Sequence, residues 1–230
     1  MLQFRMRYLL LSSWLLVLFG CSPVYKKMQA VNGNAQALQK FKPAFAVALY
    51  HTKVDVVGNH LSGLLLIKKM PDSSTRIVFS NEMGFKFFDF EFAPNGNFKV
   101  FTVIKQMNKK SVLKTLRKDF ELILMERLDS AAVSVRQNNN GLLYYVFPQT
   151  SGYYYYITDS KGNNLVRMER SSKRKTVVEA TMENYIKGIP DSISVVHKKF
   201  NFTIGLKRIE RQCYKEIFLR SAILKQQTLK

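Results

Sequence analysis

The chain has 230 residues, of which 47% are hydrophobic, and this length suffices for one sizeable core or one large β-rich domain. Its 36 lysines and arginines outnumber 16 aspartates and glutamates, so the formal net charge is +20. That balance indicates a nucleic acid or an anionic membrane surface as partner. A solvated basic surface explains the charge equally well. The sequence lacks GxSxG, P-loop, HExxH and CxxC motifs, which excludes the enzyme and metal-binding classes that those motifs mark.

The first 20 residues have the pattern of an export signal. Arg5 and Arg7 precede an apolar stretch over residues 8–19, which is shorter than the roughly 20 residues that span a bilayer. The sequence Leu18-Phe19-Gly20-Cys21 follows, and it resembles the lipobox of bacterial lipoproteins. The resemblance implies that residues 1–20 are removed as a lipoprotein signal peptide and that Cys21 carries lipid. A cysteine is required because a thiolate accepts the diacylglyceryl group.

Lipidation at Cys21 would decide the location and the partners. Two or more acyl chains hold a protein firmly on a membrane. Ser22 stands where an aspartate would be the inner-membrane retention signal, so the resemblance implies the outer membrane. Lys26 and Lys27 give no acidic export-type signal, which favours the periplasmic side. A tethered, exported protein does not meet nucleic acid, so anionic headgroups are the expected partners of the basic surface. Cys213 would then lack a disulfide partner, and stability must come from the core.

Residues 21–43 are polar and rich in small side chains, which predicts a lipidated tether leading into a short helix that ends before Pro43. From residue 44 the hydrophobic period becomes two, and Gly, Pro and Asn separate the runs. This pattern predicts an antiparallel meander of five strands, at residues 44–57, 61–69, 75–80, 85–93 and 98–105.

The period then becomes helical over residues 108–128, with an apolar stripe wide enough to cover a sheet face or plug a barrel. Strands are predicted again at residues 141–147, 153–159, 165–170, 175–182, 191–199 and 201–209. Residues 211–230 mix apolar and basic side chains and indicate a basic C-terminal tail or helix. Residues 44–210 therefore form one mainly β (α+β) domain. We expect a curved antiparallel sheet, or half-open β-barrel, of about ten strands with one long helix inside it or over its mouth.

The order of these elements over residues 28–210 resembles the LolA/LolB-like family of lipoprotein carriers and receptors. The match is best at Ile189–Val195 and Phe202–Ile209, which look like that family's last two strands. The resemblance implies an unclosed barrel with a helical lid and an apolar interior, without catalytic residues or cofactors. It also implies a membrane-facing loop between the third and fourth strands. Here that loop is Asn81–Gly84 with Met83 as its apolar residue, and a partly buried turn residue is the alternative.

Aromatic residues are abundant, with 17 Phe and 11 Tyr, and they are concentrated in residues 85–92. A bulge at Phe87-Phe88 would place Phe85, Phe87, Phe90 and Phe92 on one face and the charged residues on the other. These rings either fill an ordinary core or line a cavity for acyl chains. In the second case the cavity candidates, with two lid residues of the predicted helix, are Phe85, Phe87, Phe90, Phe92, Phe101, Leu116 and Phe120.

No residue pattern indicates an active site or a metal site. His51, His60 and His197 stand singly in or beside predicted strands, where a structural role is expected. Asp89 and Glu91 alternate with phenylalanines on one strand and are expected to face water. The sequence therefore predicts a non-enzymatic, membrane-anchored lipoprotein that binds a lipid or the acyl chains of another lipoprotein. A structural or assembly lipoprotein that docks a protein partner and has a filled core is the alternative, and a hydrolase with an unfamiliar site is a third.

Overall fold

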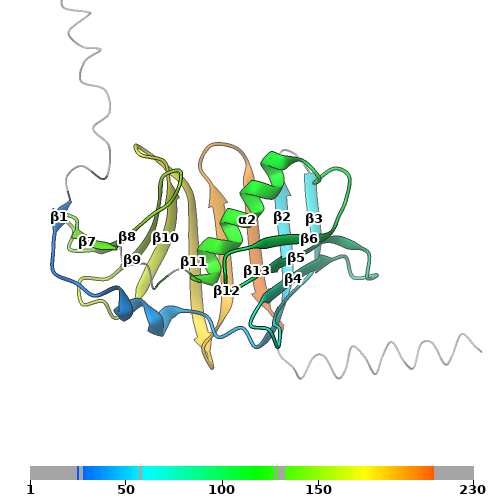
Figure 1. The fold of residues 1–230 in the computed structure, drawn as a ribbon, viewed down its shortest axis with the longest axis horizontal. Coiled ribbons are helices and arrows are strands. Elements are labelled where there is room, and N and C mark those ends of the chain that lie inside the picture. The colour runs from blue at the N-terminus through cyan, green and yellow to red at the C-terminus, as the bar shows by residue number, and fades with distance from the viewer. Residues whose placement is uncertain (1–24, 26–27, 57–58, 127, 129–132, 210–230) are drawn as a thin grey trace, which may run out of the picture.

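Thirteen strands in the described part of the chain pair antiparallel in one open, curved sheet (Figure 1). The structure is a computed structural model, and it describes residues 25, 28–56, 59–126, 128 and 133–209. The predicted signal peptide, Cys21 and the predicted C-terminal tail lie outside these residues. The predicted curved antiparallel sheet with one long helix is confirmed.

The strands and helices follow one another along the chain much as the hydrophobic periods predict. The first half contains β1 (Gln29–Ala30), the 3-10 helix η2 (Ala35–Phe41), β2 (Val47–Val56), β3 (Asn59–Lys69), β4 (Thr75–Ser80), β5 (Lys86–Phe92), β6 (Phe98–Val103) and the helix α2 (Lys110–Leu124). The second half contains β7 (Ser134–Gln137), β8 (Leu143–Pro148), β9 (Tyr153–Thr158), β10 (Leu165–Ser171), β11 (Thr176–Ile186), β12 (Ile189–His197) and β13 (Phe202–Arg208).

The sheet consists of two meanders that meet where the last strand pairs with the first long one. Its order is β1-β7-β8-β9-β10-β11-β12-β13-β2-β3-β4-β5-β6. Short turns connect sequential strands because antiparallel neighbours need no crossover. The β13–β2 pairing runs from Phe202 opposite Val56 to Arg208 opposite Tyr50. This seam makes one continuous surface of segments that are far apart in the sequence.

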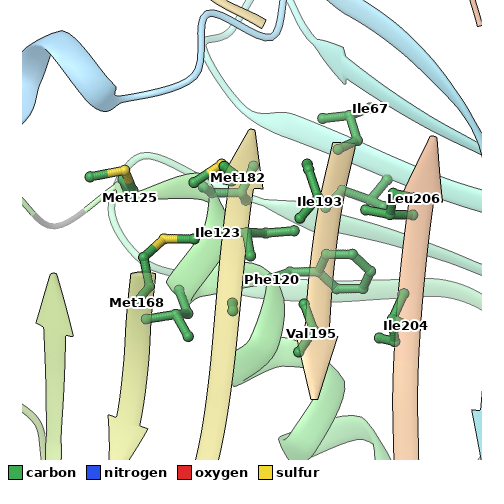
Figure 2. Close-up of a cluster of buried hydrophobic side chains, with 14 of the residues drawn as sticks. Ile67, Phe120, Ile123, Met125, Met168, Met182, Ile193, Val195, Ile204 and Leu206 are labelled. Atoms are coloured by element: carbon green, nitrogen blue, oxygen red, sulfur yellow. The ribbon is translucent and has the colours of Figure 1, made fainter. Parts of the chain in front are cut away.

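Helix α2 crosses the concave face of the sheet, in front of the strands at the centre of Figure 1. It buries Leu116, Phe120 and Ile123 on the side that faces the sheet. Figure 2 shows Phe120 and Ile123 among side chains of β12 and β13, such as Val195 and Leu206. The helix ends at Met125, whose φ of 51° is left-handed and stops the helical hydrogen bonding. The C-terminal half of α2 and the middle of the sheet thus form a closed core.

Candidate functional site

The N-terminal half of α2 stands over a cavity of about 990 Å³ that the core does not fill. Strands β2 to β5 and β13 form its wall, and the connection between β6 and α2 forms its rim. The lining residues are Thr52, Val54, Val56, Asn59, Leu61, Leu65, Phe79, Phe85, Phe87, Phe88, Ile104, Lys105, Gln106, Met107, Ser111, Val112, Thr115, Leu116, Phe120, Phe200, Phe202 and Ile204.

Small helix residues explain why this half of the interior stays open. At its N-terminal end α2 presents Ser111 and Thr115 to the cavity, and these side chains reach less far than Leu116 and Phe120 further along the helix. Phe120 closes the floor, with its ring 5.8 Å from that of Phe88 and 6.2 Å from that of Phe92 between centroids. The helix therefore fills the interior at one end of its length and leaves it hollow at the other.

The cavity opens where several loops meet at one end of the sheet. The β4–β5 loop brings Phe85, which is 59% exposed, and the β12–β13 loop brings Phe200, which is 44% exposed. The connection from β6 to α2 adds Ile104 and Met107. Exposed rings at an opening are a feature of apolar entrances, because a ligand that covers them removes their surface from water.

The chemistry of the lining suits hydrocarbon. Among the described lining residues, Lys105 is the one charged side chain, and it is exposed at the rim. Thr52, Ser111 and Thr115 supply hydroxyl groups, and the remaining wall consists largely of aliphatic and phenylalanine side chains. Apolar surface of this kind gains free energy when it is removed from water.

Four of the predicted cavity residues, Phe85, Phe87, Leu116 and Phe120, line the cavity. Strand β5 has a bulge between its pairs with β4, where Phe79 opposes Phe88 and Ser80 opposes Lys86. The bulge lies where the sequence places it, but Phe88 also turns inward. Phe87 and Phe88 both contact Phe79, at centroid distances of 4.8 and 5.6 Å.

Phe90 and Phe92 are not lining residues, contrary to the sequence prediction. Both are buried in the closed core, and each packs against Phe98 at a centroid distance of 5.1 Å. The reason is their position further along β5, beyond the level at which Phe120 closes the floor. They pack in the core behind the cavity wall and do not line the cavity.

Phe101 is also not a lining residue, because it lies on the outer face of the sheet. Val100 faces inward opposite Phe90, so the next residue, Phe101, points outward, at the position where the pairing of β6 with β5 shifts between Val100 and Thr102. Its ring lies 3.6 Å from the guanidinium carbon of Arg76, which is a cation–π contact. Arg76 in turn donates hydrogen bonds to Asp89 at 2.5 and 3.0 Å. Asp89, expected to face water, is buried in this pair.

Met83 projects from the β4–β5 turn and is 87% exposed. The turn is held by Asn81, whose Oδ1 accepts hydrogen bonds from the backbone N–H of Met83 at 3.1 Å and of Phe85 at 2.8 Å. Met83 is therefore not a partly buried turn residue, and its side chain does not line the cavity. Its contact with a membrane stays a prediction.

The sequence reading missed several lining residues on strands other than β5. Phe202 and Ile204 of β13 and Val54 of β2 reach the cavity because the β13–β2 seam brings the two chain regions together. The alternation of apolar residues in these strands could have indicated an inward face. It could not indicate which end of that face is hollow.

A buried polar cluster lies beside the cavity but contributes no lining atom. Asp119 of α2 is 1% exposed; its carboxylate accepts hydrogen bonds from Arg170 Nη2 at 2.9 Å and from His197 Nε2 at 2.8 Å. The ring of His197 packs against Phe200 and Phe202. The cluster ties the lid helix to β10 and β12, which is a structural role for His197.

The described ranges also bear on metal binding and on membrane-spanning helices. Within them, no group of three or more His, Cys, Asp or Glu side chains is placed to hold a metal ion. Over the same residues, no helix combines the length and the apolar character needed to cross a bilayer.

Comparison with solved structures finds similar folds at low sequence identity. A LolA superfamily protein from Nitrosomonas europaea is 9% identical, with a TM-score of 0.47 over 78% of this chain and 93% of that one. A domain described as that of an outer membrane lipoprotein-sorting protein, from Vibrio parahaemolyticus, is 6% identical, with a TM-score of 0.44 over 81% and 97%. A DUF1329 family protein from Desulfovibrio piger is 10% identical, with a TM-score of 0.43 over 76% and 88%.

No protein-family model matches the sequence, and no curated protein matches it either.

Proposed function

We propose that this domain binds a hydrophobic ligand, namely the hydrocarbon chain of a lipid or of an acylated lipoprotein, in the cavity beneath the N-terminal half of α2. The observation that carries the proposal is the apolar space of about 990 Å³ that neither the sheet nor the helix fills. Sites for small molecules in proteins commonly have volumes of roughly 300–1,000 Å³. The cavity is thus large enough for a flexible chain and is open to solvent at one end.

The driving force would be the removal of methylene groups from water. Each buried methylene contributes about 0.8 kcal/mol before the cost of ordering the chain is subtracted. A polar headgroup would remain at the mouth, where Lys105 and the hydroxyl group of Ser111 lie. The lining holds a ligand without transforming it, so the proposed role is non-enzymatic carriage or reception.

We further propose that the domain is held on the periplasmic face of the outer membrane by lipid on Cys21. The lipobox-like sequence at residues 18–21 and Ser22 support this location. Mass spectrometry of the protein purified from membranes tests it: the expected N-terminal peptide begins at Cys21 and carries acyl mass. An N-terminal peptide that retains residues 1–20, or an unmodified Cys21, would contradict the anchor.

The ligand is tested by organic extraction of the same purified protein, followed by lipid mass spectrometry. We expect lipid to co-purify in an amount comparable to the protein, and we expect a fluorescent fatty acid to bind the extracted protein with one site. A folded protein that carries no lipid and binds no fatty acid would overturn the cavity proposal. That result would favour a structural lipoprotein that docks a protein partner.

Neighbouring residues of α2 offer a matched pair of variants. Thr115→Trp places a large ring inside the cavity, and Lys114→Trp places the same ring on the exposed side of the helix. We expect Thr115→Trp to weaken fatty-acid binding at least tenfold and Lys114→Trp to change it less than twofold. Thermal melting of both variants checks that the fold is retained. Equal affinities of the two variants would mean that the ligand binds elsewhere.

A further inference from the structure

A second hollow, of about 620 Å³, lies at the same end of the sheet as the cavity mouth, and its lining is polar and basic. The β8–β9 loop, the β10–β11 turn and Lys199 of the β12–β13 loop line it. Four of its lining residues are cations, and none is acidic: Lys173, Arg174, Lys175 and Lys199. We call these four residues the basic rim.

Within the described residues, no acidic side chain pairs with the cations of the basic rim. All four side chains are exposed, and none of them forms an ion pair with any part of the chain that the structure describes. Lys198, next to Lys199, does have an acidic partner, since its Nζ lies 3.2 Å from Glu179. Like charges that line one hollow repel one another, and an anion bound between them would relieve that repulsion.

Backbone geometry holds the basic rim together. The hydroxyl oxygen of Ser172 accepts hydrogen bonds from the N–H groups of Arg174 at 3.3 Å and Lys175 at 3.1 Å, which fixes a tight turn. Gly152 of the neighbouring loop has a φ of +88°, and a Cβ there would lie 1.8 Å from the carbonyl oxygen of Ser171. The two loops are therefore in direct backbone contact.

The basic rim and the cavity mouth are adjacent. Lys199 lines the basic hollow, and the next residue, Phe200, lines the apolar cavity with 44% of its surface exposed. In Figure 1 the β12–β13 turn lies at the same end of the sheet as the upper end of α2. Cations and an exposed aromatic ring are thus neighbours at this end of the molecule.

The segment that follows the predicted lipid site is seated beside the basic rim. Tyr25 is buried on the convex face of the sheet, with its ring stacked on that of Tyr155 at a centroid distance of 4.5 Å. Its hydroxyl group donates to the Glu169 carboxylate at 2.6 Å and lies 2.7 Å from the hydroxyl of Thr176, the residue after Lys175. Cys21 precedes Tyr25 by four residues, a reach of at most roughly 14 Å.

From this arrangement we propose that the basic rim rests on the anionic phospholipid surface in which the lipid on Cys21 is inserted, so that the cavity mouth faces the same membrane. Phosphate groups of the lipid bind between Lys173, Arg174, Lys175 and Lys199. Tyr25 fixes the domain in this orientation because it seats the tether beside the basic rim. The role of Tyr25 depends on the predicted anchor, whereas the basic rim carries the membrane proposal without it.

Vesicle co-sedimentation tests the proposal on the mature chain with Cys21→Ser, which retains every residue described above. We expect at least tenfold stronger binding to vesicles that contain phosphatidylglycerol than to vesicles of phosphatidylcholine alone, and weaker binding as salt increases. Lys173→Gln, Arg174→Gln, Lys175→Gln and Lys199→Gln together should reduce the binding to anionic vesicles at least tenfold.

The matched control neutralises four lysines that lie in turns or on strand ends elsewhere: Lys42, Lys68, Lys161 and Lys187, each to Gln. It has the same net charge as the rim variant, and its binding should stay within threefold of the unmodified chain. Equal losses in both variants would overturn the proposal, since net charge alone would then explain the binding. Binding to soluble polyphosphate with none to vesicles would also overturn it.

The same assay separates this proposal from the cavity proposal. Thr115→Trp should leave vesicle binding unchanged even where it abolishes fatty-acid binding. The rim variant should still bind a fatty acid in aqueous solution. Failure of one measurement therefore leaves the other proposal standing.

Discussion

Asp89 lies between two buried phenylalanines of β5, yet its carboxylate is on the outer face of the sheet. Two opposing effects act on it there. Burial raises the pKa of Asp89, while the hydrogen bonds and charge of Arg76, with help from Lys86, lower it by more in total. The pKa of Asp89 is therefore below its usual range, and the folded state favours the ionised form.

This shift gives Asp89 a defined contribution to stability. We expect Asp89→Asn to lower the free energy of unfolding by about 2 kcal/mol at pH 7, because Arg76 loses its charged partner. A carboxylate with a depressed pKa stabilises the fold above its unfolded pKa of about 3.9, and that stability is lost as the pH falls through the folded pKa. Urea unfolding between pH 6 and pH 2 should therefore show the wild type and variant converging at low pH.

Glu183→Gln is the control for that measurement, since Glu183 is exposed and has no ion pair among the described residues. Its free energy of unfolding should stay within about 0.5 kcal/mol of the wild-type value over the whole pH range. If the free energies of unfolding of Asp89→Asn and the wild type differed by the same amount at pH 6 and at pH 2, the assigned role of Arg76 would be contradicted.

Single residues show which features of the strands the sequence predicts and which it does not. The run of phenylalanines predicts the β5 bulge because no regular strand places all those rings on one side. The prediction for Phe101 is wrong because the ring follows the inward-facing Val100 in the regular alternation of β6, and the extra residue at this point then returns Val103 to the inner face. Nothing in the letters 98–103 marks that extra residue.

At the scale of elements, α2 packs on the sheet with its C-terminal half and covers the cavity with its N-terminal half. The C-terminal half of the helix is held by the buried polar cluster of Asp119 with Arg170 and His197. Removing one partner from such a cluster leaves a buried charge without compensation, which costs about 3 to 5 kcal/mol. We therefore expect Asp119→Ala to lower the free energy of unfolding by about that amount, as measured by urea denaturation at pH 7.

Two further variants show whether the loss comes from the uncompensated charge. Lys114→Ala, on the exposed side of the same helix, should change the free energy of unfolding by less than about 0.5 kcal/mol. Asp119→Leu combined with Arg170→Met and His197→Phe should recover a large part of the lost stability, because an apolar set of similar volume replaces the whole cluster. A triple variant as unstable as Asp119→Ala would mean that the shape of the cluster matters more than its charge.

The sequence indicated most elements, but not the shortest ones or the pairing of distant ones. The helix over 108–128 and the hairpins are visible because their periods extend over many residues. Strands β7 and β1 contain four and two residues, too few to establish a period of two. The β13–β2 pairing joins residues about 150 positions apart, and no local signal encodes it. The hollow half of the interior follows from that pairing, so its lining was only partly predictable.

At the scale of the whole molecule, the two meanders share one sheet but differ in what they enclose. The cavity wall takes β2 to β5 from one meander and β13 from the other, so it crosses the β13–β2 seam. The seam lies in the middle of the sheet and pairs segments that are distant in the sequence, so we expect it to break only if the sheet as a whole opens. Strands β1 and β6, at the two edges of the sheet, each pair on one side only.

Hydrogen exchange followed by mass spectrometry can measure this difference. Amides of β13 and β2 that pair across the seam, such as those between Ile204 and Val54, should exchange only through global unfolding and show the highest protection of the domain. Amides of β1 and β6 should exchange through local opening, with free energies well below the global value. If β13 and β2 exchanged as fast as the edge strands while β3 stayed protected, the two meanders would open independently. The cavity would then be able to widen at its β13 wall without unfolding of the core, and ligand entry would not be confined to the mouth.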